Sequence, residues 1–271
     1  MKILALNASP RQRAGATFRL LESLIAGMAD EGASTELFNL VDLDLHPCRG
    51  CYTCWVTTPG ACIHRETGMA RLIDAWRAAD IVVFGTPLYH FSMSGLMKTF
   101  LDRLLPESEP WLVEDAQVSG WTTHPRRHHQ PASALLVSPS GFPDTDQFAP
   151  LVYTFRYIAQ RHHWAWLGEL LRPGAGVLSA AISLPEVAAY LTDVRRVGKA
   201  IIALGRIPAS LHKTIGRDLV AGGRTAFYEQ ANQHWEQLLK HRSGSAPVNN
   251  AYFGSSPTGQ QPSASNARGA R

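Results

Sequence analysis

The sequence predicts an α/β fold in which a parallel, doubly wound sheet is covered by helices on both faces. Two observations indicate this class. Short apolar runs alternate along the chain with longer segments whose apolar residues recur at helical spacing. The run DIVVFG at residues 80–85 shows no alternation of polar and apolar positions, which is typical of a strand buried on both faces.

The first elements follow from the spacing of apolar residues. Residues 2–6 form a short apolar strand that leads into a polar loop over residues 7–15. From Phe18 to Met28 the apolar positions repeat with the period of a helix, and Gly32 supplies a stop signal. Residues 35–40 predict a second strand, and the cysteine-bearing segment follows as a loop.

The later elements continue the alternation of strand and helix. In order, they are helix 69–79, strand 80–85, helix 94–105, strand 134–138, helix 144–161, strand 164–171 and helix 184–204. Sheets of this kind bind ligands at the carboxyl ends of their strands. The loops that begin at Asn7, Thr86 and Pro139 are therefore the expected functional loops.

Composition excludes several classes of protein. The chain has 271 residues, of which 45% are hydrophobic and 18% charged, so it can form an extensive core in one or two domains. No apolar run approaches the roughly 20 residues of a membrane span. The apolar stretch at the N-terminus is too short for a signal peptide. We expect a soluble, cytoplasmic protein with no membrane partner.

The charge balance favours an anionic small molecule over nucleic acid. The net charge is +4, and 21 of the 26 basic residues are arginine. These arginines are spread along the chain, and no basic block with interleaved aromatic residues is present.

Two segments lie outside the alternation of strands and helices. Residues 106–131 form a long insertion after the third strand–helix unit, rich in tryptophan and histidine. Because Pro125 follows His124, a regular helix that would align His124 with His128 is not expected, and we interpret these histidines as a polar surface rather than a metal site. Residues 243–271 are polar and predict a disordered tail, which leaves residues 1–242 as one domain.

The loop after the first strand carries groups that suit a phosphate monoester. Ser9 and Thr17 offer hydroxyl groups, Arg11 offers a guanidinium, and Gly15 permits close approach of the backbone at a helix start. The loop matches neither the G-x-x-x-x-G-K-[ST] nor the G-x-G-x-x-G pattern. The alternative is an ordinary capped turn in which Ser9 or Thr17 only satisfies backbone N–H donors.

The loop after the third strand suits a flat aromatic ring. Pro87 stiffens the turn, Tyr89 and Phe91 can frame a ring, and the backbone N–H groups of Ser92 and Met93 can meet its polar edge. The alternative is that these apolar side chains only cover the end of the strand.

Four cysteines fall within one short segment. Cys48, Cys51, Cys54 and Cys62 have the spacing C-x2-C-x2-C-x7-C, which cannot form a distributed disulfide framework. Four thiolates suit a 4Fe–4S cluster or tetrahedral zinc. The third possibility is that the cysteines are free thiols.

Three motifs, taken in order, resemble the NADPH-dependent FMN reductase family, and most closely its iron–sulfur flavoprotein branch. They are S-P-R-x(5)-T after the first strand, the four-cysteine segment, and G-T-P-L-Y-x-F-S-M-S-G-L-M-K-x-F-x-D-R after the third strand. The resemblance runs from Met1 to about Lys240 and includes His124-Pro125-Arg126, Ser140-Gly141-Phe142-Pro143 and the pattern A-N-x-x-W at Ala231, Asn232 and Trp235.

The resemblance implies a flavodoxin-like fold, with a five-stranded sheet of order 2-1-3-4-5, and an FMN cofactor. It implies that Ser9, Arg11 and Thr17, with Gly15, hold the phosphate, although Ala16 stands where the family often has Asn. The implied contacts of the flavin ring are Pro87, Leu88, Tyr89, Phe91, Ser92 and Met93, with Ser140, Gly141 and Phe142 at its other edge. The spacing of the cysteines favours a 4Fe–4S cluster by the same resemblance.

The implied activity is electron transfer from NAD(P)H through FMN to a small acceptor: a quinone, a nitroaromatic, a metal ion or free flavin. No catalytic side chain is expected, because the flavin carries the chemistry. One alternative is an iron–sulfur flavoprotein electron carrier reduced by ferredoxin. Another is a non-catalytic regulator that binds zinc or a ligand.

We also expect a homodimer or homotetramer in which a neighbouring chain completes the flavin site. The cysteine segment, the insertion and the aromatic residues Trp55, Trp111 and Trp121 would form the shared cleft.

Overall fold

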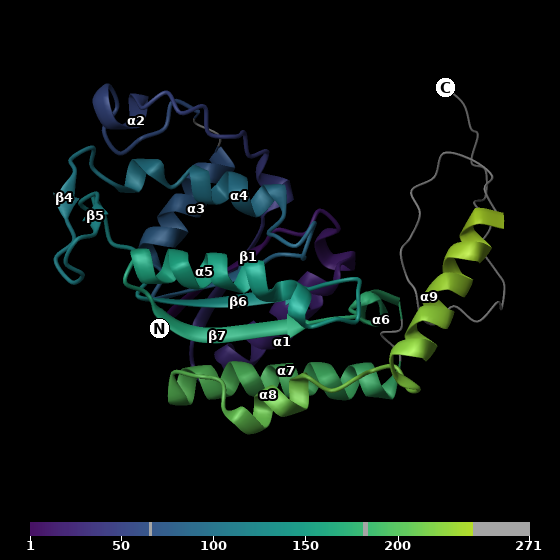
Figure 1. The fold of residues 1–271 in the computed structure, drawn as a ribbon. Helices are drawn as coiled ribbons and strands as arrows, with labels where there is room; N and C mark the ends of the chain where they lie inside the picture. The colour runs from purple at the N-terminus through teal and green to yellow at the C-terminus, as the bar shows by residue number, and fades with distance from the viewer. Residues whose placement is uncertain (65–66, 181–183, 241–271) are drawn as a thin grey trace, which may run out of the picture.

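The computed structural model describes residues 1–64, 67–180 and 184–240. Its centre is a five-stranded sheet of order β2-β1-β3-β6-β7, in which every neighbouring pair is parallel (Figure 1). The strands are β1 (Lys2–Asn7), β2 (Ser34–Asn39), β3 (Ile81–Gly85), β6 (Ser133–Pro139) and β7 (Ala165–Arg172). Numbered within this sheet alone, the order is 2-1-3-4-5, so the predicted flavodoxin-like topology is confirmed.

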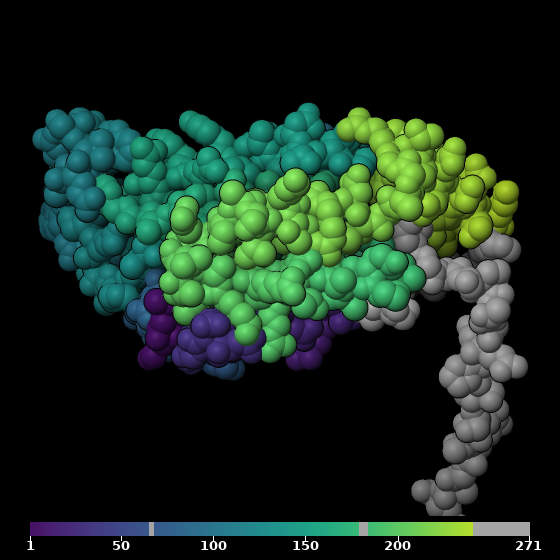
Figure 2. All heavy atoms as spheres, turned by 90° about the horizontal axis from the view of Figure 1, so that it is seen from below, coloured from purple at the N-terminus to yellow at the C-terminus, as the bar shows by residue number. Residues whose placement is uncertain are grey.

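Helices cover both faces of the sheet. One face carries α1 (Ala16–Asp30), α6 (Gly176–Ala180), α7 (Pro185–Leu204) and α8 (Ala209–Ile215), and the other carries α3 (Thr67–Ala78), α4 (Gly95–Asp102) and α5 (Ala149–Arg161) (Figure 1). Figure 2 shows α7 and α8 in green spread over the lower face. Helix α9 (Gly223–Lys240) extends from the end of the molecule toward which β7 points (Figure 1). No described helix combines the length and apolar composition needed to cross a bilayer.

The strands divide the core into two layers because successive side chains point to opposite faces. In β1, Ile3 and Ala5 pack into the layer that contains α1 and α7. Leu4 and Leu6 pack into the layer built by α3, α4 and α5, where Trp76 is fully buried. Both faces of the strand are thus apolar, which explains its lack of alternation.

Helices α1 and α7 pack with their backbones in close contact. A Cβ atom on Gly198 would lie 2.0 Å from the Leu24 carbonyl oxygen, so only glycine fits there. Beside this contact Arg195 donates to both carboxylate oxygens of Asp30, at 2.7 and 2.6 Å. These hydrogen bonds hold the pKa of Asp30 well below its usual range.

The predicted strands and long helices lie within a few residues of those observed, whereas the short elements were missed. The insertion contains a small antiparallel sheet, and the cysteine loop contains one helical turn. These unpredicted elements, together with three additional helices, are β4 (Val113–Glu114), β5 (Thr122–Thr123), α2 (Thr53–Val56), α6, α8 and α9. The helix predicted over residues 94–105 ends at Asp102 and is followed by a 3-10 turn at Leu105–Glu107. The helix predicted from residue 144 begins as a 3-10 turn at Asp146–Phe148. Elements this short depend on tertiary contacts rather than on their own apolar period.

The predicted tail, residues 243–271, lies outside the described residues.

Candidate functional site

The loops that follow β1, β3 and β6 meet at the carboxyl edge of the sheet and enclose a cavity of about 210 Å³. Its lining residues are Ser9, Arg11, Gly15, Ala16, Thr17, Pro87, Leu88, Tyr89, Pro139, Ser140, Gly141, Ala175 and Gly176. The cavity therefore brings the four residues of the predicted phosphate loop together with parts of both predicted ring-binding loops.

The phosphate loop is held by its own short-range hydrogen bonds. The Ser9 N–H donates to Asn7 Oδ1 at 3.2 Å, and the Arg11 N–H donates to Ser9 Oγ at 3.3 Å. Asn7 in turn donates from Nδ2 to Asn39 Oδ1 at 2.9 Å, which ties the loop to the end of β2. Ser9 is buried, and its hydroxyl keeps its own proton as a donor for a ligand in the cavity.

The start of α1 is shaped to accept an anion. Gly15 is the N-cap residue, and no side-chain hydrogen bond caps the helix. Ser9 Oγ does satisfy one backbone donor of the loop, the Arg11 N–H, as the alternative of a capped turn expects. The first-turn N–H groups of an uncapped helix attract negative charge. A Cβ atom on Gly15 would lie 2.7 Å from Ser9 Oγ and 3.3 Å from Arg11 Cβ. Glycine therefore keeps open the space between these two side chains, and the residues present fit a phosphate.

Hydrogen bonds join the three loops to one another. Ser94, the N-cap of α4, donates from Oγ to the Ala8 carbonyl at 2.8 Å, and its N–H donates to Thr86 Oγ1 at 2.9 Å. The Leu88 N–H donates to the Pro139 carbonyl at 2.9 Å. The phosphate loop and the ring-binding loops are therefore one connected structure. The sequence motif contains Thr86 and Ser94, but their linking role was not predicted.

The tip of the third-strand loop projects from the cavity. Tyr89 and Ser92 exchange two backbone hydrogen bonds of 3.0 Å, and His90 and Phe91 between them have positive φ angles. The Ser92 N–H is thus engaged by Tyr89 rather than directed at a ring edge as predicted. Phe91, Ser92 and Met93 do not line the cavity, and Met93 packs against the core.

The loop after β6 contributes a third side of the cavity. The Ser140 N–H donates to the Arg172 carbonyl at 2.9 Å, and the Ala175 N–H donates to the Ser140 carbonyl at 2.8 Å. Ala175 and Gly176, which enter the cavity at the start of α6, were not predicted, because small residues outside a motif carry no sequence signal. Phe142 is exposed and lies outside the cavity.

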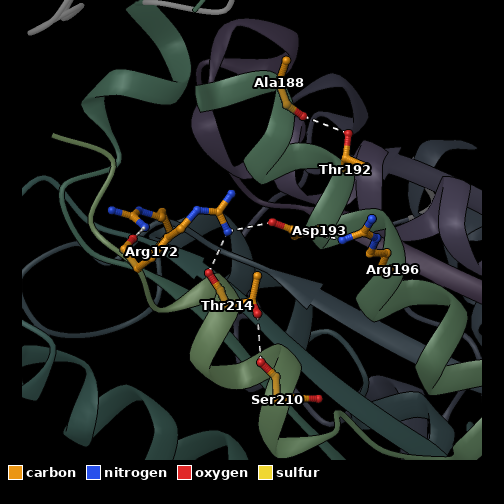
Figure 3. Close-up of polar contacts among 8 residues, drawn as sticks. Arg172, Ala188, Thr192, Asp193, Arg196, Ser210 and Thr214 are labelled. Carbon is orange, nitrogen blue, oxygen red and sulfur yellow. Dashed lines mark hydrogen bonds and ion pairs between the residues drawn. The ribbon is translucent and has the colours of Figure 1, made fainter. Parts of the chain in front are cut away.

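A buried arginine network supports this loop from below (Figure 3). Arg172, at the end of β7, donates to the Arg217 carbonyl at 2.7 Å, and Arg217 donates to Asp193 at 2.7 Å. Both guanidinium groups lie over the ring of Tyr190, at 5.1 and 5.3 Å from its centroid. Burial raises the pKa of Tyr190. The network fixes the end of β7 to α7 and to the segment after α8, and no sequence motif indicated it.

The four cysteines line one small cavity of about 20 Å³, together with Arg103. Cys54 is buried, whereas Cys48 and Cys51 are exposed. Four thiols are a suitable donor set for a cluster or zinc. In this conformation, however, no three His, Cys, Asp or Glu residues of the described chain converge closely enough to hold a metal ion.

The environment of the thiols differs from one cysteine to the next. The Thr53 hydroxyl donates to Cys51 Sγ at 3.3 Å and lowers the pKa of Cys51. Burial raises the pKa of Cys54, and the neighbouring Cys62 raises it further.

The cysteines and the cavity at the carboxyl edge lie at opposite ends of α4. Ser94, which caps the start of this helix, contacts the predicted phosphate loop, whereas Asp102 at its end lines the cysteine cavity. Eight helical residues span about 12 Å. In Figure 1 the cysteine segment around α2 lies far from α6, whose first residue lines the carboxyl-edge cavity. Within one chain the cysteines therefore do not border that cavity.

Part of the chain is similar to a known family. Residues 1–130 match the model of the NADPH-dependent FMN reductase family. The resemblance inferred from the order of the motifs is confirmed. An iron-sulfur flavoprotein of Methanocaldococcus jannaschii is 32% identical over 113 residues, which cover 39% of this chain and 53% of that protein. One from Archaeoglobus fulgidus is 32% identical over 103 residues, which cover 38% and 48%. The chain thus spans about half the length of these curated relatives.

Solved structures of other proteins share the fold. An FMN-dependent NADH-azoreductase from Bacillus anthracis superposes with a TM-score of 0.53 at 12% identity, covering 74% of this chain and 99% of that one. An NAD(P)H:quinone oxidoreductase from Methanothermobacter marburgensis gives 0.51 at 15% identity, covering 74% and 96%. At such identities the likeness shows the fold alone.

Proposed function

We propose that the protein is an FMN-dependent NAD(P)H oxidoreductase that passes electrons to a small acceptor such as a quinone, a nitroaromatic, a metal ion or free flavin. The observation that carries the proposal is the cavity at the carboxyl edge of the sheet. There an uncapped helix start, a glycine cradle and Arg11 meet the loop after β3. The match of residues 1–130 to the FMN reductase family supports the same assignment.

The phosphate end of the cofactor belongs to the α1 side of the cavity. The hydroxyl groups of Ser9 and Thr17 and the first N–H groups of α1 donate to the phosphate oxygens, and Arg11 neutralises their charge. Gly15 leaves the room that these contacts need.

The ring end belongs to the loops after β3 and β6. Pro87, Leu88 and Tyr89 line the cavity from the loop after β3 and would hold the ring, with Ser140 and Gly141 from the loop after β6. Phe91, Ser92, Met93 and Phe142 are assigned to the rim, because they lie beyond the cavity itself. FMN, when bound, supplies the hydride chemistry, and these residues orient its ring and exclude water from it.

The test is anaerobic purification followed by an absorption spectrum and quantification of FMN. We expect stoichiometric FMN as purified or after reconstitution, and protein that never binds FMN would end the proposal. Rapid mixing with NADH and NADPH then measures bleaching of the flavin.

A second candidate is an electron carrier of the iron–sulfur flavoprotein kind, reduced by ferredoxin. The observation that favours it is the four cysteines on one cavity, and the curated relatives bear that name. A carrier of this kind shows little bleaching with NAD(P)H, and it contains iron and sulfide in equal amounts. Purified protein that contains zinc but neither iron nor flavin would instead indicate the third alternative, a non-catalytic regulator that binds zinc or a ligand.

The quaternary structure proposed is a homodimer or homotetramer with a shared flavin site. Because the cysteine segment lies at the far end of α4 from its own cofactor cavity, it can face a flavin only in a neighbouring chain. Size-exclusion chromatography with light scattering tests this. A monomer with full NAD(P)H-dependent flavin reduction would contradict it.

A further inference from the structure

A second and larger cavity, of about 880 Å³, opens at the opposite edge of the sheet. The insertion over residues 106–131 forms much of its lining, and the segment between α5 and β7 adds His162 and His163. Ala132, directly before β6, also lines it, so the cavity lies at the amino ends of the strands. The usual ligand site of a doubly wound sheet lies at the carboxyl ends of the strands, where the first cavity is found. This volume falls in the range of roughly 300–1,000 Å³ that is usual for small-molecule sites.

Two arginines give the cavity its charge. Arg126 donates to the His162 carbonyl, and Arg161 donates to the Thr122 carbonyl while its guanidinium lies 4.5 Å from the centroid of the Trp121 ring. Within the described part of the chain, neither arginine forms an ion pair with a carboxylate. Each guanidinium has five N–H donors, so most of them are available to a ligand.

The other titratable groups of the cavity do not cancel this charge. Asp115 is engaged by His163 Nε2 at 2.8 Å and by the backbone N–H groups of Gln117 and Val118 at 2.9 and 3.0 Å. Burial lowers the pKa of His162 to about 4, with a further contribution from Arg126, so this imidazole is neutral. The Asp115 carboxylate offsets part of the charge of Arg126, so the two guanidinium groups leave the cavity with a net positive charge.

A buried amide and an apolar wall complete the site. Gln130 is only 6% exposed and lines the cavity, and its carboxamide oxygen has no hydrogen-bond partner among the described residues. A buried acceptor without a donor is costly, and a ligand N–H or O–H removes that cost. Leu101, Leu104 and Leu105 supply an apolar surface from the end of α4 onward.

We propose that this cavity binds a small organic anion that has a flat apolar body, a carboxylate and a hydroxyl group that donates to the Gln130 oxygen. The carboxylate pairs with Arg126 and Arg161, and the body lies against the leucines. The site goes beyond the proposed oxidoreductase function, because α4 separates it from the cofactor cavity. It adjoins the cysteine segment, since His124 in its lining packs at 4.8 Å between ring centroids on Trp55.

The probe is 6-hydroxy-2-naphthoate, whose hydroxyl group can donate to Gln130, titrated into the purified full-length protein by calorimetry. The uncharged 6-hydroxy-2-naphthamide is its matched ligand. We expect naphthoate to bind with a Kd below about 1 mM and naphthamide to bind at least about tenfold more weakly. Arg161→Gln and Arg126→Gln should each weaken naphthoate about tenfold, with partial rescue by Arg161→Lys. The control is Arg156→Gln, since Arg156 lies on the same helix as Arg161 but pairs with Glu169 at 2.8 Å outside the cavity.

Absence of saturable binding up to about 5 mM, equal affinity for the two ligands, or arginine variants that bind like the parent would each overturn the proposal. Far-ultraviolet circular dichroism confirms that each variant is folded. FMN content is measured on the same samples, so loss of the cofactor site and loss of the anion site are told apart.

Discussion

The two ends of the sheet carry sites of different origin. At the carboxyl edge, each loop of the cofactor cavity directly follows a strand, and hydrogen bonds through Ser94 and Leu88 join the loops. At the amino edge, the larger cavity depends on an insertion that the fold does not require. The first site is therefore a consequence of the topology, and the second is a consequence of one added segment.

The largest expected effect tests the cofactor end. Arg11→Ala should weaken FMN binding by about one to two decades, because a charge-assisted contact to phosphate is worth about 1.5–3 kcal/mol. Fluorescence titration of FMN measures it. Arg13→Ala is the matched control, since its guanidinium lies over the Phe18 ring, 5.4 Å from the centroid, and not in the cavity. Equal losses in both variants would remove the distinction that assigns the phosphate to Arg11.

The next prediction concerns the amino end. The folded pKa of His162 is about 4, whereas an unfolded histidine titrates near 6.5, so the unfolded state binds the extra proton between these values. The free energy of unfolding should fall as pH drops from 6.5 toward 4, by at most about 1.4 kcal/mol per pH unit. Denaturant unfolding at several pH values measures the slope.

His162→Phe keeps an aromatic ring to stack on Trp164, at 4.6 Å between centroids in the parent, and should flatten that slope. Replacing the exposed His212 by Gln should leave it unchanged. A slope that survives in His162→Phe would show that another group causes the acid sensitivity.

A smaller effect is expected at the glycine cradle. Gly15→Ala places a methyl group 2.7 Å from Ser9 Oγ and displaces that hydroxyl, so FMN affinity should fall about fivefold, or roughly 1 kcal/mol. Gly95→Ala, where nothing lies within 4 Å of the added carbon, serves as the control. FMN binding in Gly15→Ala equal to that of the control would contradict the cradle.

Removal of residues 243–271 is expected to have no effect on the protein. FMN content and melting temperature should stay those of the full chain, because the polar composition of this segment offers little apolar surface to bury. A drop in either quantity would place the segment against the domain or a neighbouring chain.

Sequence reasoning succeeded where a signal is local. The run at residues 80–85 predicted β3 to within one residue, and the order of motifs predicted the FMN reductase resemblance. The positions of Ser9, Arg11 and Thr17 around one cavity followed from a single strand–loop–helix pattern.

Sequence reasoning failed where residues far apart in the sequence come into contact. Ala175 reaches the cofactor cavity, and Arg172 supports it, only through the fold of β7 and α6. The spacing of the cysteines indicated that the four thiols belong to one site. It did not indicate that this site lies at the far end of α4. The histidines were interpreted as a polar surface, but the sequence did not indicate that they line one cavity together with residues of other elements.

Backbone hydrogen bonds join the two ends of the insertion to each other. The Arg127 N–H donates to the Glu107 carbonyl at 2.8 Å, and the Glu109 N–H donates to the Pro125 carbonyl at 2.8 Å, so the two ends of the segment lie side by side. A segment closed in this way can be exchanged for one of another length or content at little cost to the sheet. Exchange of this segment would therefore alter the lining of the amino-edge cavity and leave the loops of the carboxyl-edge cavity in place.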